Sequence, residues 1–192
     1  MKIGLYFGSF NPIHIGHLAI ANYITEFTDI NKVWFVISPQ NPFKNKISLL
    51  NDNHRYQLVN LAIESFNKFK ASNIEFKLPK PSYTIDTLTY LKEKYPNKKF
   101  VLIIGSDNVP TFDKWKNYHE IIRQYEIYVY PRPDTDLKLV EDKYPSFKII
   151  DAPLIEISSS FIRNAIKEKK EVKYFLPEKV YEYIKEMHFY EK

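Results

Sequence analysis

The sequence contains no cysteine among its 192 residues. This excludes a disulfide framework, a cysteine-ligated zinc site and a thiol nucleophile. No apolar run approaches the ~18 residues that a transmembrane helix requires, and the apolar run at the N-terminus is too short for a signal peptide. The sequence also has no internal repeat, low-complexity tract or obvious linker. We therefore expect a soluble, cytoplasmic protein without membrane association, folded as a single domain over residues 1–192.

The residues that are present favour a globular core and an anionic partner. Hydrophobic residues make up 44% of the chain, and 15 tyrosines and 14 phenylalanines supply much of the packing volume. This composition is sufficient for a sizeable core without disulfides. The formal net charge of +5 suits a nucleotide or RNA, although a lysine-rich solvated surface explains the same excess. Charge alone therefore does not identify the partner.

Short apolar segments alternate with amphipathic segments along the chain. The expected strands are residues 3–7, 33–38, 74–78, 100–104, 126–130 and 147–150. The spacing of apolar residues predicts helices around residues 18–24, 59–66, 85–91, 161–166 and 180–187. Strands that alternate with helices are typical of parallel sheets. We therefore predict an α/β fold, a Rossmann-like doubly wound parallel sheet, with a helical C-terminal part at about residues 157–192.

Ligands of such sheets bind beyond the carboxyl ends of the strands, where the strand order reverses. After the first expected strand, Gly8 leaves room for a phosphate and Ser9 adds a hydroxyl, while the loop amides and the next helix start form an anion site. His14 and His17 lie three residues apart at this helix entry, where imidazoles stabilise charge on a phosphate. A lone histidine there is more often a helix cap, but the pair favours function. A metal site is a poor alternative, because no other His, Cys or carboxylate cluster lies near in sequence.

Two further segments carry polar groups that suit a nucleotide. Asp107 follows a buried strand directly, where it either bonds ribose hydroxyls or caps a helix. Ser158 and Ser159 begin an expected helix, and Arg163 lies about one turn inside it. Hydroxyls, main-chain amides and a guanidinium in this arrangement suit a phosphate. A serine-rich helix cap with a solvated arginine is the plain alternative.

The quoted segments resemble one family of enzymes. Residues 8–17 (Gly-Ser-Phe-Asn-Pro-Ile-His-Ile-Gly-His) resemble the signature of the nucleotidyltransferase superfamily, and specifically of nicotinate mononucleotide adenylyltransferases. The His-Ile-Gly-His part alone is also similar to the ATP-binding motif of class I aminoacyl-tRNA synthetases. Residues 81–88 (Pro-Ser-Tyr-Thr-Ile-Asp-Thr-Leu), residues 105–107 with the later Trp115, and residues 157–163 resemble the adenylyltransferases. The resemblance covers nearly the whole chain, with its segments in the order of the family.

The resemblance implies a role for each segment. The implied ATP-binding residues are Gly8, Ser9, Phe10, Lys44, Gly105, Asp107, Ile157, Ser158 and Ser159. The implied catalytic residues are His14, His17 and Arg163. The implied acceptor site is Tyr83, Thr84 and Trp115, with the indole stacked on the pyridine ring and main-chain amides near Thr84 holding the nicotinate carboxylate. The chain departs from the family at Phe7, Phe43 and Asp134, which leaves the exact role of Lys44 open, as it is for Arg132 in its Pro-Arg-Pro turn.

The implied reaction moves AMP from ATP to nicotinate mononucleotide and releases pyrophosphate, without a protein nucleophile. Mg²⁺ is the expected cofactor, held by substrate and water because no carboxylate cage is visible. The expected partners are ATP and nicotinate mononucleotide, without nucleic acid, and a homo-oligomer is compatible with the sequence. The alternatives are an adenylyltransferase for the amidated mononucleotide or for phosphopantetheine, a synthetase-like RNA-binding module, and a catalytically inactive nucleotide sensor.

Overall fold

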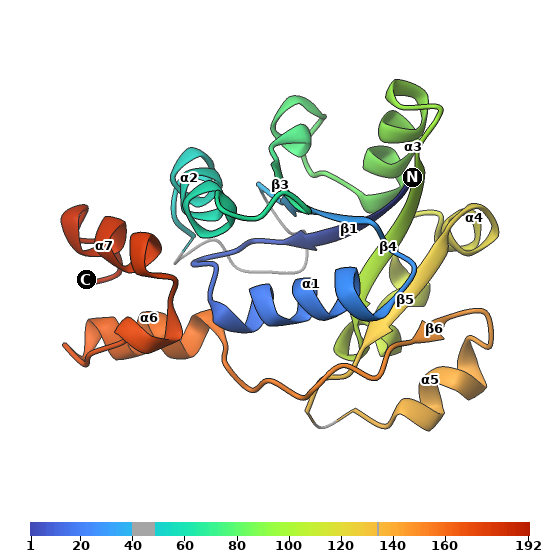
Figure 1. Cartoon of the computed structure of the whole chain (residues 1–192). Helices are drawn as coiled ribbons and strands as arrows, with labels where there is room; N and C mark the ends of the chain where they lie inside the picture. Colours follow the sequence, from blue (N-terminus) through green and yellow to red (C-terminus); the bar gives the residue numbers. More distant parts are fainter. Residues whose placement is uncertain (40–48, 134) are drawn as a thin grey trace.

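The computed structural model describes residues 1–39, 49–133 and 135–192. Within these ranges, six parallel strands form one sheet in the order β3-β2-β1-β4-β5-β6 (Figure 1). The strands are β1 (Lys2–Gly8), β2 (Lys32–Ile37), β3 (Phe69–Ser72), β4 (Lys99–Gly105), β5 (Glu126–Tyr130) and β6 (Lys148–Ile149). The strand order reverses between β1 and β4, which confirms the doubly wound, Rossmann-like sheet.

Helices cover both faces of this sheet. They are α1 (Ile15–Phe27), α2 (Asp52–Ile63), α3 (Thr84–Lys94), α4 (Tyr118–Gln124), α5 (Leu137–Lys143), α6 (Ser159–Lys167) and α7 (Glu178–Glu186), with the 3-10 segments η2 (Ile74–Lys77), η3 (Ser106–Lys114) and η4 (Lys173–Phe175). Helices α1, α2, α6 and α7 contribute to the core on one face, whereas α3, α4 and α5 contribute to the core on the other. Across the described residues, no helix combines the length and the apolar character needed to cross a membrane.

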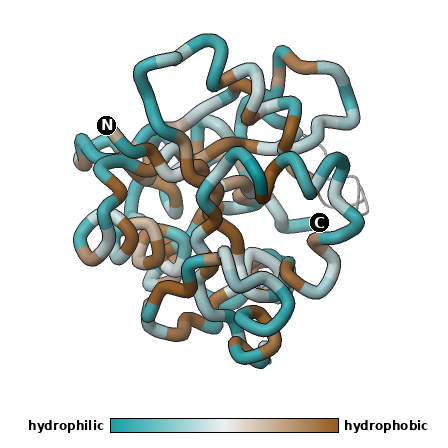
Figure 2. The backbone as a smooth tube through the Cα atoms, turned by 90° about the vertical axis from the view of Figure 1, so that its right-hand side faces the viewer, coloured by the Kyte–Doolittle hydropathy of each residue, from teal (hydrophilic) through white to brown (hydrophobic). Residues whose placement is uncertain are grey.

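The central strands are apolar throughout because successive residues pack into the cores on opposite faces of the sheet. In β1, Tyr6 packs in one core and Leu5 in the other, and Leu5 lies in register with Trp34 of β2 and Leu102 of β4. Strands that are buried on both faces are continuously hydrophobic for this reason. Figure 2 shows hydrophobic segments through the middle of the molecule and hydrophilic ones mostly toward its outside.

One predicted strand is wrong. Residues 74–78 form the 3-10 segment η2 and its end, and the third strand is Phe69–Ser72. Ile74, Phe76 and Leu78 alternate as a strand would, but main-chain hydrogen bonds from Phe76 N to Asn73 O and from Leu78 N to Glu75 O close tight turns there. The true strand lies at the edge of the sheet, so its sequence Phe-Lys-Ala-Ser carries less apolar signal.

The helices follow the predicted pattern at their centres and differ at their ends. α2 ends at Ile63, so Phe66 lies outside it and its ring packs on the Phe69 ring at 4.6 Å. Asn51 caps α2 by accepting a hydrogen bond from Asn53 N. The short helices α4 and α5 were not predicted, because each has only 7 residues and too few turns to show an apolar stripe.

The predicted helical C-terminal part is present and packs beside the carboxyl end of β1. Figure 1 shows α6 and α7 at the left, at the end of the molecule toward which β1 runs. Ile162 of α6 and Val180 and Ile184 of α7 belong to the same core as Tyr6 of β1. This packing places the start of α6 near the carboxyl end of β1, where the strand order reverses.

Candidate functional site

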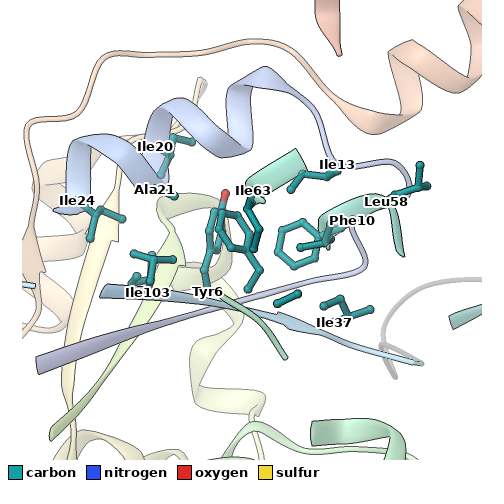
Figure 3. Close-up of a cluster of buried hydrophobic side chains, with 14 of the residues drawn as sticks. Tyr6, Phe10, Ile13, Ile20, Ala21, Ile24, Ile37, Leu58, Ile63 and Ile103 are labelled. Carbon is teal, nitrogen blue, oxygen red and sulfur yellow. The ribbon is translucent and has the colours of Figure 1, made fainter. Parts of the chain in front are cut away.

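The loop between β1 and α1 turns sharply at the reversal point. Phe10 has a φ of 45°, in the left-handed region, and its side chain is only 1% exposed. Its ring lies among Ile13, Ile37 and Leu58 in the core (Figure 3). A Cβ atom at Gly8 would stand 2.8 Å from this ring, so glycine is required there for packing, a reason that the sequence did not reveal. Phe10 therefore offers only main-chain atoms to a ligand.

Arg55 of α2 holds this loop from within the protein. Its side chain is fully buried, and its Nη1 donates to Ser9 O at 2.5 Å and to Ser38 O at 3.0 Å. Its Nε donates to Leu50 O at 2.9 Å, and its Nη2 donates to Asp52 Oδ1 at 2.6 Å. One guanidinium therefore ties the segments after β1 and β2 to α2. Sequence reasoning missed this residue.

The start of α6 holds the same loop from the other side. The Ser159 hydroxyl donates to Pro12 O at 2.8 Å, and Arg163 Nη1 donates to Asn11 O at 2.7 Å. Ser158 is the N-cap residue of α6, and its Oγ accepts a hydrogen bond from Phe161 N at 3.1 Å. The structure thus brings together the two segments to which the sequence assigned phosphate contacts. Arg163 bonds a loop carbonyl rather than facing only solvent.

The two histidines meet at the N-terminus of α1. The His14 N–H donates to His17 Nδ1 at 3.2 Å, so a neutral His17 ring carries its proton on Nε2. The two ring centroids are 3.7 Å apart, and the ring planes are tilted by 33° to each other. Both imidazoles therefore stand at the positive end of a helix dipole, where an anion is stabilised.

His14 is buried and electrically neutral. Its side chain is 3% exposed, and burial, together with the Arg132 cation, lowers its pKa from the ordinary 6.5 to about 3. A Cβ at Gly16 would stand 3.0 Å from His14 Nδ1, so the glycine of the His-x-Gly-His motif makes room for this ring. Within the part of the chain that the structure describes, Nδ1 has no hydrogen-bond partner. A buried nitrogen of this kind is a site where a ligand atom fits.

The loop after β4 is hydrogen-bonded to the segment after β5 at the reversal point of the sheet. Arg132 N donates to Ser106 Oγ at 2.8 Å, and Arg132 Nη2 donates to the Tyr130 hydroxyl at 3.1 Å. Asp107, which follows Gly105 and Ser106, lies exposed with its Oδ1 3.8 Å from Arg132 Nε. Arg132, whose role the sequence left open, is thus a half-buried cation at the reversal point, close enough to His14 to lower the pKa of that imidazole.

The two segments with an implied acceptor role also lie together. Tyr83 is the N-cap residue of α3, which begins at Thr84, and Trp115 follows η3. Lys116, next to Trp115, places its Nζ 4.6 Å from the centre of the Tyr83 ring and 2.9 Å from Asp86 Oδ2. The ion pair and the ring contact therefore join the start of α3 to the indole-bearing segment.

The remaining predicted residues occupy different surroundings. Ile157 is half-buried and packs against the core just before α6, so its main chain is what it offers a nucleotide. Lys44 lies outside the described residues. Across residues 1–39, 49–133 and 135–192, no group of three or more His, Cys, Asp or Glu residues is arranged to hold a metal ion. The site as described is suited to binding and stabilising phosphate anions.

Comparisons with known proteins show the family and the fold. The family model of cytidylyltransferase-like proteins matches residues 5–165. The chain is 55% identical to a probable nicotinate-nucleotide adenylyltransferase of Flavobacterium johnsoniae over 100% of both chains. It is 51% identical to a protein of the same description from Cytophaga hutchinsonii, over 99% of this chain and 98% of that one. A solved Plasmodium falciparum nicotinic acid mononucleotide adenylyltransferase complexed with NaAD has the same fold, with a TM-score of 0.81 at 22% identity over 99% of this chain and 97% of that chain.

Proposed function

The chain belongs to the nicotinate-nucleotide adenylyltransferases of the cytidylyltransferase-like family, and we propose that it transfers AMP from ATP to nicotinate mononucleotide. The products are nicotinate adenine dinucleotide and pyrophosphate, a step in NAD biosynthesis. The observation that carries this function is the close pair of His14 and His17 rings at the start of α1, with the start of α6 hydrogen-bonded to the same loop. Phosphoryl transfer requires preorganised hydrogen-bond donors and cations around its phosphates.

The reaction proceeds by in-line displacement. A phosphate oxygen of nicotinate mononucleotide attacks the α-phosphorus of ATP, and the new phosphorus–oxygen bond forms on the face opposite the leaving group. The bond from the α-phosphorus to the oxygen that bridges to the β-phosphorus breaks, and pyrophosphate leaves with the electron pair. Both partners are anions that need no protein nucleophile, so the protein contributes positioning and charge stabilisation.

Each group of the site has a proposed part in this displacement. The Nε2–H of His17 donates to the ATP phosphates, and the His14 ring lies beside the His17 ring. Ser158, Ser159 and Arg163 act on the leaving pyrophosphate from the start of α6. Asp107 is exposed after β4, where its carboxylate accepts from ribose hydroxyls.

The acceptor binds between the start of α3 and the segment of Trp115. Trp115 stacks on the pyridine ring, and main-chain amides at Thr84 and Lys116 hold the nicotinate carboxylate. The contact of Lys116 with Tyr83 and Asp86 supports this assignment, because it keeps the two segments adjacent.

Magnesium enters as part of the MgATP substrate. Bound to the phosphate oxygens of ATP, the ion would neutralise part of their charge, and the protein's own donors would act on the remainder. The substrates are small nucleotides rather than nucleic acid, and the protein acts in the cytoplasm as one domain.

The test is pyrophosphate release from MgATP with one acceptor at a time. Nicotinate mononucleotide should give the highest kcat/KM, nicotinamide mononucleotide a lower value and phosphopantetheine none. Release with phosphopantetheine alone, or no release with either mononucleotide, would overturn the proposed function. A preference for nicotinamide mononucleotide would keep the reaction and change the substrate.

A further inference from the structure

A buried carboxylate lies at the carboxyl end of β3, outside the groups assigned so far. Glu75 of η2 is 2% exposed, and its two oxygens are bonded separately. The Ser82 hydroxyl donates to Oε2 at 3.0 Å, and the Thr87 hydroxyl donates to Oε1 at 2.8 Å. Among the ion pairs of the described residues, none includes Glu75.

This placement is costly and therefore calls for a reason. Burial raises the pKa of Glu75, while the hydroxyls of Thr87, Ser38 and Ser82 lower it. A carboxylate removed from water without a cation is tolerated only when its oxygens are well hydrogen-bonded. An apolar residue would fill the same space without this penalty. What the carboxylate adds is directed bonds to Ser82 and Thr87, which are five residues apart in sequence, besides its contact with the Ser38 hydroxyl.

Those two side chains bracket the proposed acceptor segment. Ser82 precedes Tyr83 and Thr84, and Thr87 follows them in the first turn of α3. The Thr87 hydroxyl also lies 3.4 Å from Tyr83 O. Tyr83 is the N-cap residue of α3 but makes no side-chain cap hydrogen bond. The entry to α3 is therefore held by the carboxylate of Glu75 rather than by its own cap.

We infer that Glu75 is a positioning residue for the acceptor nucleotide, which fixes the main chain of residues 82–84 in the conformation that receives the nicotinate group. The inference rests on the proposed function, because the acceptor role of Tyr83 and Thr84 belongs to that proposal. Glu75 acts through Ser82 and Thr87 and does not itself contact the substrate. Loss of its bonds should therefore weaken acceptor binding more than ATP binding, because Arg55 and α6 also hold the loop between β1 and α1.

The experiment measures separate Michaelis constants for nicotinate mononucleotide and ATP in four single variants and one double variant. Glu75→Gln leaves one acceptor oxygen and turns an N–H group toward a hydroxyl, and Thr87→Val removes one donor. Each should raise the KM for nicotinate mononucleotide by about tenfold, the scale of a lost hydrogen bond to a charged group, with the KM for ATP changed by less than about twofold. Thr87→Ser, which keeps the hydroxyl, should restore the wild-type value. Val140→Ala, in the same core but in α5, controls for general loss of stability.

The outcomes separate the inference from the function. If the wild type is active but Glu75→Gln raises both Michaelis constants equally, or neither, the inference is wrong and the function stands. The same holds if Val140→Ala, at an equal loss of Tm, raises the acceptor KM as much. The double variant Glu75→Gln/Thr87→Val should be no worse than the worse single variant, because one network is lost; full additivity would also refute the inference. Failure of the wild type to use either pyridine mononucleotide refutes the proposed function instead, and the inference with it.

Discussion

Replacement of His14 by asparagine should remove a defined part of the pH dependence of folding. The buried imidazole is held neutral, with its pKa lowered from 6.5 to about 3 by burial and by Arg132. In the unfolded chain the same group titrates near its ordinary value. The folded form therefore keeps its full stability from this residue above pH 6.5 and loses it progressively as the pH falls toward 3, because protons bind the unfolded state first.

The size of this effect follows from the two pKa values. At pH 5 the unfolded chain is protonated at this histidine and the folded chain is not, so the linkage lowers the free energy of unfolding by about 2 kcal/mol relative to pH 8. Between pH 6 and 4 the slope approaches about 1.4 kcal/mol per pH unit. A change of this size is readily measured against a total stability of about 5–15 kcal/mol.

The assay is urea unfolding of the wild type and the His14→Asn variant at several values between pH 8 and 4.5. The variant loses packing at every pH, but the groups that titrate in common cancel in the difference between the two proteins. Relative to the wild type, the variant should therefore gain about 2 kcal/mol between pH 8 and pH 5. His119→Asn, at an exposed position of α4, controls for the histidine-to-asparagine exchange outside the candidate site. A constant difference between wild type and His14→Asn would refute the buried, neutral state of this imidazole.

Three further substitutions test the catalytic assignments. His17→Asn keeps an acceptor for the His14 N–H but removes the Nε2 donor, so turnover should fall at least about 100-fold with little change in Tm; near-normal turnover would exclude the catalytic role. Trp115→Ala should raise the KM for nicotinate mononucleotide several-fold more than that for ATP, as expected for a stack worth about 0.5–1.5 kcal/mol, and equal effects on both would make the indole a packing residue. Arg163→Lys replaces a fork that bonds Asn11 O and Ser160 Oγ with a point charge, so turnover should fall clearly while ATP affinity by titration weakens modestly. An unchanged turnover number would exclude the leaving-group role.

The parts of the fold that could be predicted are those whose signal is local. β1, β2, β4 and β5 are continuously apolar because both faces are covered, and this pattern is visible in the residues themselves. The segment around Glu75 was wrongly predicted as a strand because Ile74, Phe76 and Leu78 alternate with polar residues. The same alternation occurs in this 3-10 segment, in which the polar residue Glu75 is buried. The sequence cannot show that Glu75 finds hydroxyls 7 and 12 residues further along the chain.

The residues of the candidate site likewise fall into those with a local sequence signal and those without one. The glycine and histidine loop and the serine-rich start of α6 are compact motifs, and the structure brings them into contact. Arg55 and Arg132 could not be identified as site residues in this way. Arg55 lies in the first turn of an amphipathic helix, where an arginine is ordinarily solvated, and its main partner in the site is the Ser9 carbonyl 46 positions away. Such contacts have no periodicity and become visible only when the chain is folded.

The contacts of Asn11 explain why the C-terminal helices belong to the site. Its carbonyl accepts from Arg163, and its Oδ1 accepts from Leu50 N at 3.2 Å and from the Tyr190 hydroxyl at 2.8 Å. One loop residue therefore depends on the segment before α2, on α6 and on the residues that follow α7. A turn with a left-handed residue such as Phe10 persists only when its surroundings hold it. The geometry of the loop between β1 and α1 therefore depends on residues up to 179 positions away in sequence. The C-terminal part of the chain thus helps to hold the loop between β1 and α1 in its observed conformation.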